Sequence, residues 1–222
     1  VLVQGSMVSA LHTSLARLRP DLVIISGDFT QRAKLREFEE ARAFLDALPA
    51  PYLAVPGNHD IRLYDVYGRF VRPLQGYKRF ISETVEPLYT DQELTVVSVN
   101  TARSLIFMGG RINEGQVRRI VRELRESAPG AIRILVAHHP LDLPESLQHC
   151  LCGRARMALS ALATSGLDMI LSGHLHLPYL PKPVERLRVG GHTALLVQAG
   201  TAVSMRARGY RNSFNSIEMQ YD

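Results

Sequence analysis

Apolar residues recur along this chain with two different spacings, and each spacing predicts a different element. Apolar positions three and four apart form one face of an amphipathic helix, whereas short unbroken apolar runs are typical of buried strands. We predict helices over residues 8–18, 36–48, 113–124 and 155–165. The first of them carries its apolar face on Val8, Leu11, Leu15 and Leu18.

Residues that favour helix ends support these limits. Asn113, with Gln116 three positions later, has the pattern of a helix N-cap. Pro20 closes the first predicted helix, because proline cannot continue a helix, and Gly166 follows the last one as a stop. The helix limits are therefore predicted from capping residues as well as from periodicity.

Strand-like runs alternate with these helices along the chain. They cover residues 22–26, 52–55, 94–99, 132–137, 169–172, 186–189 and 194–199. Alternation of this kind predicts an α/β fold in which helices cover the faces of a sheet. We expect residues 1–222 to form a single domain, since a chain of this length can bury one large core.

Two stretches of the chain lack a clear period. Residues 61–89 are the least regular part, and their tyrosines and arginines are suited to cap a site. Residues 141–153 form a second segment of this kind. We expect plain surface loops in both places, with a cap or lid over the site as the alternative.

The composition is that of an ordinary globular protein, with 46% hydrophobic and 21% charged residues. No apolar stretch approaches the roughly 20 residues that cross a bilayer, so we expect a cytoplasmic protein without a transmembrane segment. Peripheral membrane contact and a homodimer both stay open.

A net charge of +5 favours anionic partners such as phosphate esters, although a basic surface also keeps a protein soluble. No basic cluster is dense enough to predict a specific nucleic-acid groove.

Cys150 and Cys152 are separated by a single residue. This spacing is awkward for a relaxed disulfide, and two cysteines are too few for a zinc cage. We therefore expect free thiols that pack or line a loop in a reducing compartment.

Residues able to bind a metal follow directly after four of the predicted strands. Five of the eight histidines of the chain lie in these blocks. Imidazole nitrogens, a carboxylate and an amide oxygen suit divalent metals such as Mn, Fe, Ni or Zn. Ligands at the ends of strands are held by the sheet yet open to substrate. The blocks are Gly27-Asp28, Gly57-Asn58-His59-Asp60, His138-His139-Pro140 and Gly173-His174-Leu175-His176.

The residue types in the first two blocks suggest separate roles. Asp28 follows a wholly apolar strand, and a half-buried carboxylate there requires a cation or several donors; a helix cap is the alternative. Asn58 can offer a metal its amide oxygen without adding charge. His59 is placed to donate a proton to a leaving oxygen, and Asp60 to orient the imidazole of His59.

The last two blocks differ in the spacing of their histidines. Neighbouring residues on a strand face opposite ways, so we expect one of His138 and His139 to be a ligand. Residues two apart on an extended segment face the same side, so His174 and His176 can enter one cavity.

In this order, the blocks resemble the calcineurin-like metallophosphoesterase family, and in particular its bacterial cyclic-nucleotide phosphodiesterase-type members. The family pattern runs Asp-x-His, Gly-Asp, Gly-Asn-His-Asp/Glu, a strand-end His and Gly-His-x-His. The resemblance implies a four-layer α/β/β/α sandwich of two mixed sheets flanked by helices, and a pair of divalent metal ions (Mn, Fe, Zn or Ni). It also implies that Asp28 bridges the metals, that Asn58, His138 and His174 complete one site, that His176 belongs to the other, and that His59 assists the leaving group.

The first family motif is the one departure. The strand-like residues 1–4 are followed by Gly5-Ser6-Met7 where the Asp and His belong. Two explanations stay open, namely that residues are missing between Gln4 and Gly5, or that Gly-Ser-Met is a cloning remnant at a truncated end. Either one leaves the second metal with Asp28 and His176 alone.

By this resemblance we expect hydrolysis of a small phosphodiester through in-line attack of a metal-bridging hydroxide. Arginines in loops that follow strands are candidates to clamp the phosphate, with ordinary surface cations as the alternative. These candidates are Arg103, Arg111, Arg206 and Arg208.

Three other functions compete with this one. A hydrolase similar to UDP-2,3-diacylglucosamine pyrophosphatase would need an apolar groove, which residues 61–89 or 141–151 could supply. A binding scaffold of the same fold would be compatible with the absent Asp-x-His motif. A DNA-processing nuclease is disfavoured, because no basic and aromatic track is present.

Overall fold

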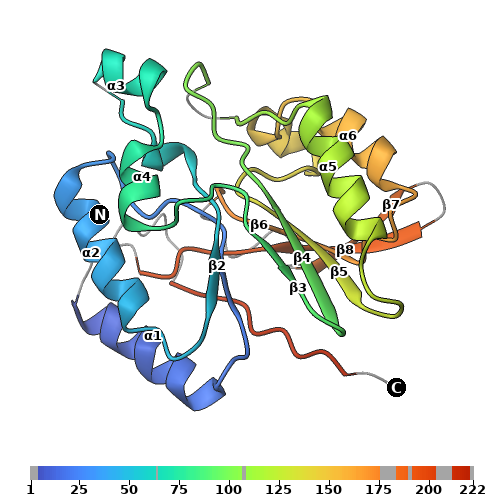
Figure 1. Ribbon diagram of the computed structural model, residues 1–222, viewed down its shortest axis with the longest axis horizontal. Helices are drawn as coiled ribbons and strands as arrows, with labels where there is room; N and C mark the ends of the chain where they lie inside the picture. Colours follow the sequence, from blue (N-terminus) through green and yellow to red (C-terminus); the bar gives the residue numbers. More distant parts are fainter. Residues whose placement is uncertain are drawn as a thin grey trace.

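The computed structural model describes residues 5–63, 65–106, 109–175, 184–189, 192–203 and 212–220. Helices and strands alternate along the chain (Figure 1). The helices are α1 (Gly5–Leu18), α2 (Leu35–Asp46), α3 (Val66–Val71), α4 (Gln75–Phe80), α5 (Glu114–Arg125) and α6 (Ala155–Leu162), with 3₁₀ helices η1 (Asn58–Asp60) and η2 (Glu145–Cys150). The strands are β1 (Val23–Ile25), β2 (Tyr52–Ala54), β3 (Leu88–Thr90), β4 (Leu94–Val99), β5 (Ile132–Ala137), β6 (Met169–Ser172), β7 (Val184–Val189) and β8 (His192–Gln198).

The strands build two sheets. The larger one has six strands in the order β3-β4-β5-β6-β8-β7, in which β4, β5, β6 and β8 run parallel and each outer strand is antiparallel to its neighbour. The smaller one pairs β1 and β2 in parallel, with Val23 opposite Tyr52. The inner strands β4, β5 and β6 are apolar and largely buried, as parallel strands covered on both faces must be.

Apolar clusters on either side of the sheets define the layers. Residues such as Val97 and Ile170 of the larger sheet pack with the buried faces of α5 and α6. Their strand neighbours point the other way, because side chains alternate along a strand, and there Val96 and Ile134 meet Leu53 of β2. A further cluster joins α2 and α4 to the outer side of the smaller sheet.

Helix, sheet, sheet and helix thus follow one another, with α1 and α2 on one side and α5 and α6 on the other (Figure 1). The predicted α/β sandwich is confirmed. The larger sheet is mixed, as expected, and the smaller sheet consists of parallel strands within the described residues. The strand expected at residues 1–4 lies outside the described part of the chain.

Most elements begin and end close to the predicted positions. The predicted cap is present, since the backbone N–H of Gln116 donates to Asn113 Oδ1 (2.9 Å) and the N–H of Asn113 donates to Gln116 Oε1 (3.0 Å). Strands β4, β5 and β6 have the predicted limits. Within the described residues, no helix is both long enough and apolar enough to cross a bilayer.

Residues 61–89 are more regular than the sequence indicated. They contain α3 and α4 and the first residues of the edge strand β3, and residues 141–153 contain η2. The expectation of an irregular stretch was wrong because helices of six residues, such as α3 and α4, are too short to display a period. Whether either segment acts as a cap or lid stays a prediction.

Both cysteines are free thiols, as predicted. Cys152 is buried in the core between the larger sheet and its helices. Burial raises the pKa of the Cys152 thiol to about 12, with a smaller opposing effect of Arg103. The thiol is therefore protonated at neutral pH and unreactive, since the thiolate is the nucleophile.

The Tyr77 hydroxyl anchors α4 to β2. It is fully buried and donates to the carbonyl oxygen of Ala54 (2.8 Å), next to the loop that carries Asn58. Tyr77→Phe leaves that carbonyl unsatisfied, so we expect the free energy of unfolding in urea to fall by about 1–2 kcal/mol. The exposed Tyr89, whose hydroxyl donates to Asp91, provides the control. A loss of similar size in Tyr89→Phe would contradict this explanation.

Candidate metal centre

The predicted ligands of the metal site lie where strands of both sheets end. Asp28 follows β1, Asn58 follows β2, His138 follows β5 directly and His174 follows β6. The carboxyl ends of parallel strands share one edge of a sheet, and ligands of α/β proteins bind at that edge. Because β2 packs against β4 and β5, the edges of the two sheets lie next to each other.

Four donor atoms converge at this place. Asn58 Oδ1 lies 3.1 Å from His138 Nε2 and 3.1 Å from His174 Nδ1. Asp28 Oδ2 lies 3.5 Å from His138 Nε2. Ligands at about 2.1 Å from one ion are about 3.0–3.4 Å from each other. Both the spacing and the mixture of nitrogen and oxygen donors therefore fit a divalent metal such as Mn, Fe, Ni or Zn.

The proton of His138 is fixed by the backbone. His138 is 1% exposed, and its Nδ1 lies 2.6 Å from the carbonyl oxygen of Ser26. A carbonyl oxygen only accepts, so Nδ1 carries the proton and Nε2 presents its lone pair toward Asn58. A metal-binding histidine usually has such a partner at its second nitrogen. Ser26 could not be predicted as part of the site, because it contributes its backbone carbonyl and not its side chain.

The backbone around the donors is strained. Asp28 and His174 both adopt left-handed conformations, with φ of 60° and 72°. Residues other than glycine rarely do so, and such strain concentrates at functional sites. Gly27 also has a positive φ (99°), and a Cβ there would lie 2.6 Å from His138 Nδ1. Glycine at this position lets the backbone come close to the imidazole.

Asp60 does not have the role that the sequence suggested. Its carboxylate accepts hydrogen bonds from Gly57 N (2.9 Å), Thr30 N (2.9 Å) and Thr30 Oγ1 (3.1 Å) and so joins the loops after β1 and β2. Burial, and then the negative charge of Asp28, raise the pKa of Asp60 to about 7, against the effect of these donors. A cation beside Asp28 would remove the second of these causes.

The orienting partner of His59 is a backbone carbonyl. His59 Nδ1 lies 2.9 Å from the carbonyl oxygen of Gln31, in the position that we expected Asp60 to occupy. The backbone N–H of His59 donates to Asp28 Oδ1 (3.1 Å). The imidazole is half-buried. Gln31 had no signal in the sequence for the same reason as Ser26.

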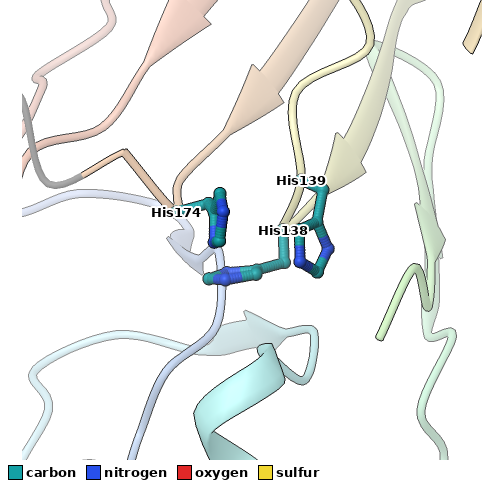
Figure 2. Close-up of side chains that lie close together, drawn as sticks. All are labelled: His138, His139 and His174. Carbon is teal, nitrogen blue, oxygen red and sulfur yellow. The ribbon is translucent and has the colours of Figure 1, made fainter. Parts of the chain in front are cut away.

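His139 joins the cluster with His138 and His174. Ring nitrogens of these three residues lie within 4.8 Å of one another, and Figure 2 shows the rings gathered where β5 and β6 end. The alternation expected from a strand does not separate His138 from His139, because β5 ends at Ala137. His139 is fully buried, and its Nδ1 lies 2.8 Å from Thr101 Oγ1.

The predicted phosphate-binding arginines fall into different surroundings. The guanidinium of Arg103 donates to the carbonyl oxygens of Asn100 and Ala102 (2.8 Å each) and to Gln116 Oε1 (2.6 Å). These hydrogen bonds hold the guanidinium within the β4–α5 loop. The phosphate-binding role that the sequence suggested for Arg103 is therefore corrected to a structural one, which is to stabilise this loop. Arg111 is exposed, and its N–H donates to the carbonyl of Thr101 (2.8 Å). His176, Arg206 and Arg208 lie outside the described residues.

A sequence model of the calcineurin-like phosphoesterase family matches residues 6–178. The chain is 27% identical over 134 residues to a probable cyclic nucleotide phosphodiesterase of Synechococcus sp., an alignment that covers 60% of this chain and 47% of the relative. The chain thus spans about half the length of that relative.

Two further relatives are phosphodiesterases by name. A glycerophosphodiester phosphodiesterase of Enterobacter lignolyticus is 41% identical over 58 residues, which is 26% of this chain and 20% of the relative. A probable cyclic nucleotide phosphodiesterase of Xenorhabdus bovienii is 22% identical over 191 residues, which is 84% of this chain and 69% of the relative.

Substitution of Gly27 tests the close approach to His138. Gly27→Ala puts an alanine in a backbone conformation with positive φ, which costs about 1–2 kcal/mol. It also places the new Cβ against the His138 ring and the backbone of Gly57. We expect a total loss of unfolding free energy of about 2–5 kcal/mol. Gly130, also at positive φ (82°) with nothing within 4 Å of an added Cβ, isolates the backbone cost. Equal losses in Gly27→Ala and Gly130→Ala, measured by urea denaturation, would refute the close approach.

Proposed function

The chain belongs to the calcineurin-like phosphoesterase family, and from this membership we propose that it hydrolyses a small phosphodiester with the help of two divalent metal ions. The observation that carries the proposal is the convergence of Asn58 Oδ1 with His138 Nε2 and His174 Nδ1 at 3.1 Å each. The preference for diesters is supported by relatives that are named phosphodiesterases.

We assign one metal to Asp28, Asn58, His138 and His174. The second would be held by Asp28 as the bridging ligand and by His176, which the resemblance to the family motif supplies. Bound dications would lower the pKa of a coordinated water toward about 7 and offset charge on the phosphoryl oxygens. Mn, Fe, Zn and Ni all suit this donor set.

The residues of the chain position the substrate and the proton. The Nδ1–H of His59 donates a hydrogen bond to the carbonyl oxygen of Gln31. The other ring nitrogen, Nε2, is then the one that can protonate the leaving oxygen when the imidazole is charged. Asp60 acts at one remove, by tying Thr30 to Gly57 and so holding the loop of Asn58 and His59. Among the candidate arginines within the described residues, we propose that Arg111 contacts the phosphate. Arg111 is exposed and follows Gly110, which lies against His139.

One observation favours a second substrate class. Helix α3 exposes Tyr67 (74%), Phe70 (52%) and Val71 (54%). Exposed apolar groups on one short helix would suit an acylated diester of the UDP-2,3-diacylglucosamine kind. A higher kcat/KM for an acylated substrate than for its soluble headgroup analogue would favour this alternative.

Loss of the converging donors tests catalysis against a purely binding role. With Mn²⁺ and bis-p-nitrophenyl phosphate, we expect turnover by the unsubstituted protein and a loss of about 10–100-fold or more in Asn58→Ala, since loss of a group that only supports a metal ligand already costs about 10–100-fold. Arg36→Ala provides the control, because Arg36 forms an exposed ion pair with Glu40 on α2. Bound metal without turnover in the unsubstituted protein would favour the binding scaffold.

The proton donor is tested by the leaving group. In His59→Asn we expect kcat/KM to fall about 10²–10⁴-fold for a diester with an alkoxide leaving group, which needs protonation. The loss should be much smaller for p-nitrophenolate, which departs as an anion. Equal losses for both substrates would assign His59 to binding and contradict proton donation.

A further inference from the structure

We infer that Thr101 fixes the proton of His139 on Nε2, so that His139 is a positioning residue for His138 and His174 and not a third histidine ligand. The inference rests on the proposed function, because it concerns which members of the histidine cluster can hold the metal. The ring nitrogens alone do not decide this, since all three histidines lie within 4.8 Å of one another.

Two hydrogen bonds join Thr101 to His139. The backbone N–H of His139 donates to Thr101 Oγ1 (3.2 Å), and the same oxygen lies 2.8 Å from His139 Nδ1. Both residues are fully buried. Within the described part of the chain, Nδ1 is the acceptor that the structure gives this hydroxyl, so the hydroxyl proton points to Nδ1.

The direction of this hydrogen bond decides the tautomer. A neutral imidazole has one N–H and one lone pair, so a ring that accepts at Nδ1 carries its proton on Nε2. A histidine binds a metal through a nitrogen lone pair. In His139 the lone pair is on Nδ1, where it accepts the hydrogen bond from the Thr101 hydroxyl. His138 is the opposite case, because the carbonyl of Ser26 takes its Nδ1 proton and leaves Nε2 to bind.

The ring of His139 contacts both neighbours. Its centroid lies 4.7 Å from that of His138 in an edge-on arrangement (89°) and 4.5 Å from that of His174. A rigid ring in this place limits the rotation of both proposed ligands. Gly110 closes the remaining space, since a Cβ there would collide with His139 Nδ1 and the carbonyl oxygen of Thr101.

A polar network holds Thr101 in turn. The carbonyl oxygen of the preceding residue, Asn100, accepts from Arg103 (2.8 Å) and from Gln116 Nε2 (2.8 Å). The backbone N–H of Asn100 donates to Glu86 Oε1 (2.9 Å), and Glu86 Oε2 pairs with Arg119 at 3.0 Å. The β4–α5 loop is therefore fixed to α5, and with it the hydroxyl that sets the tautomer of His139.

Histidine ¹⁵N NMR of the unsubstituted protein tests the tautomer without an activity assay. We expect His139 to show the couplings of an Nε2–H ring, and to keep that proton when Zn²⁺ is added. The side-chain nitrogens of His138 and His174 should shift on the same addition. An Nδ1–H ring, or loss of the Nε2 proton with Zn²⁺, would overturn the inference. If His138 and His174 did not respond to Zn²⁺, the proposed metal site would fail, while the metal-free spectrum would still decide the tautomer.

Substitution of Thr101 tests the positioning role. Thr101→Val keeps the shape but removes the hydroxyl, so we expect the Zn²⁺ dissociation constant to rise by about 10-fold or more and the Nδ1–H tautomer of His139 to become populated. Thr101→Ser restores the hydroxyl and should restore both readouts. Thr95→Val is the matched control, since Thr95 is a buried threonine of β4 whose hydroxyl pairs with Thr90 (3.1 Å). Wild-type Zn²⁺ affinity and an unchanged tautomer in Thr101→Val would refute the role.

Discussion

Apolar side chains packed between the two sheets hold the sandwich together and bring the candidate ligands to one place. Leu53 of β2 and Val55, directly after that strand, pack with Val96 and Ile134 on the larger sheet. This contact brings the ends of β1 and β2 next to the ends of β5 and β6, and each pair of strands runs parallel. Donors that are far apart in the sequence, such as Asn58 and His138, thereby come within 3.1 Å. Burial of apolar area stabilises the sandwich, and the same burial assembles the polar site at its edge.

Within that frame, the partners of the imidazoles decide what each ring can do. A backbone carbonyl holds the Nδ1 proton of His138 and another holds that of His59. The hydroxyl of Thr101 does the reverse for His139. Three residues of one type are thereby suited to different roles, His138 as a ligand, His59 as a proton donor and His139 as a positioning residue. The difference lies in the hydrogen-bond partner, and carbonyl oxygens provide a partner that substitution of side chains cannot remove.

The site also concentrates strain. Asp28 and His174 are held in left-handed conformations that cost free energy in residues other than glycine. Asp60 is 1% exposed and ties the loops after β1 and β2 through its contacts with Thr30 and Gly57. A rigid double sheet can hold such conformations because its own burial supplies the stability. A divalent cation would stabilise the converging donors further, since it offsets the charge of Asp28.

The pattern of apolar residues along the chain was enough to predict the alternation of helices and strands and the α/β class. Apolar runs predicted β4, β5 and β6 with their limits. The polar residues that follow strands predicted Asp28, Asn58, His138 and His174 as ligands, and the structure brings these side chains together. Short elements such as α3 and α4 were not predictable, because six residues do not establish a period. Nor were the roles of Ser26 and Gln31, which act through backbone carbonyls that every residue has. The contacts of Gln31 with His59 and of Arg103 with the β4–α5 loop became visible only in the folded chain. The direction in which a carbonyl or guanidinium points depends on packing between distant segments, and no local pattern in the sequence encodes it.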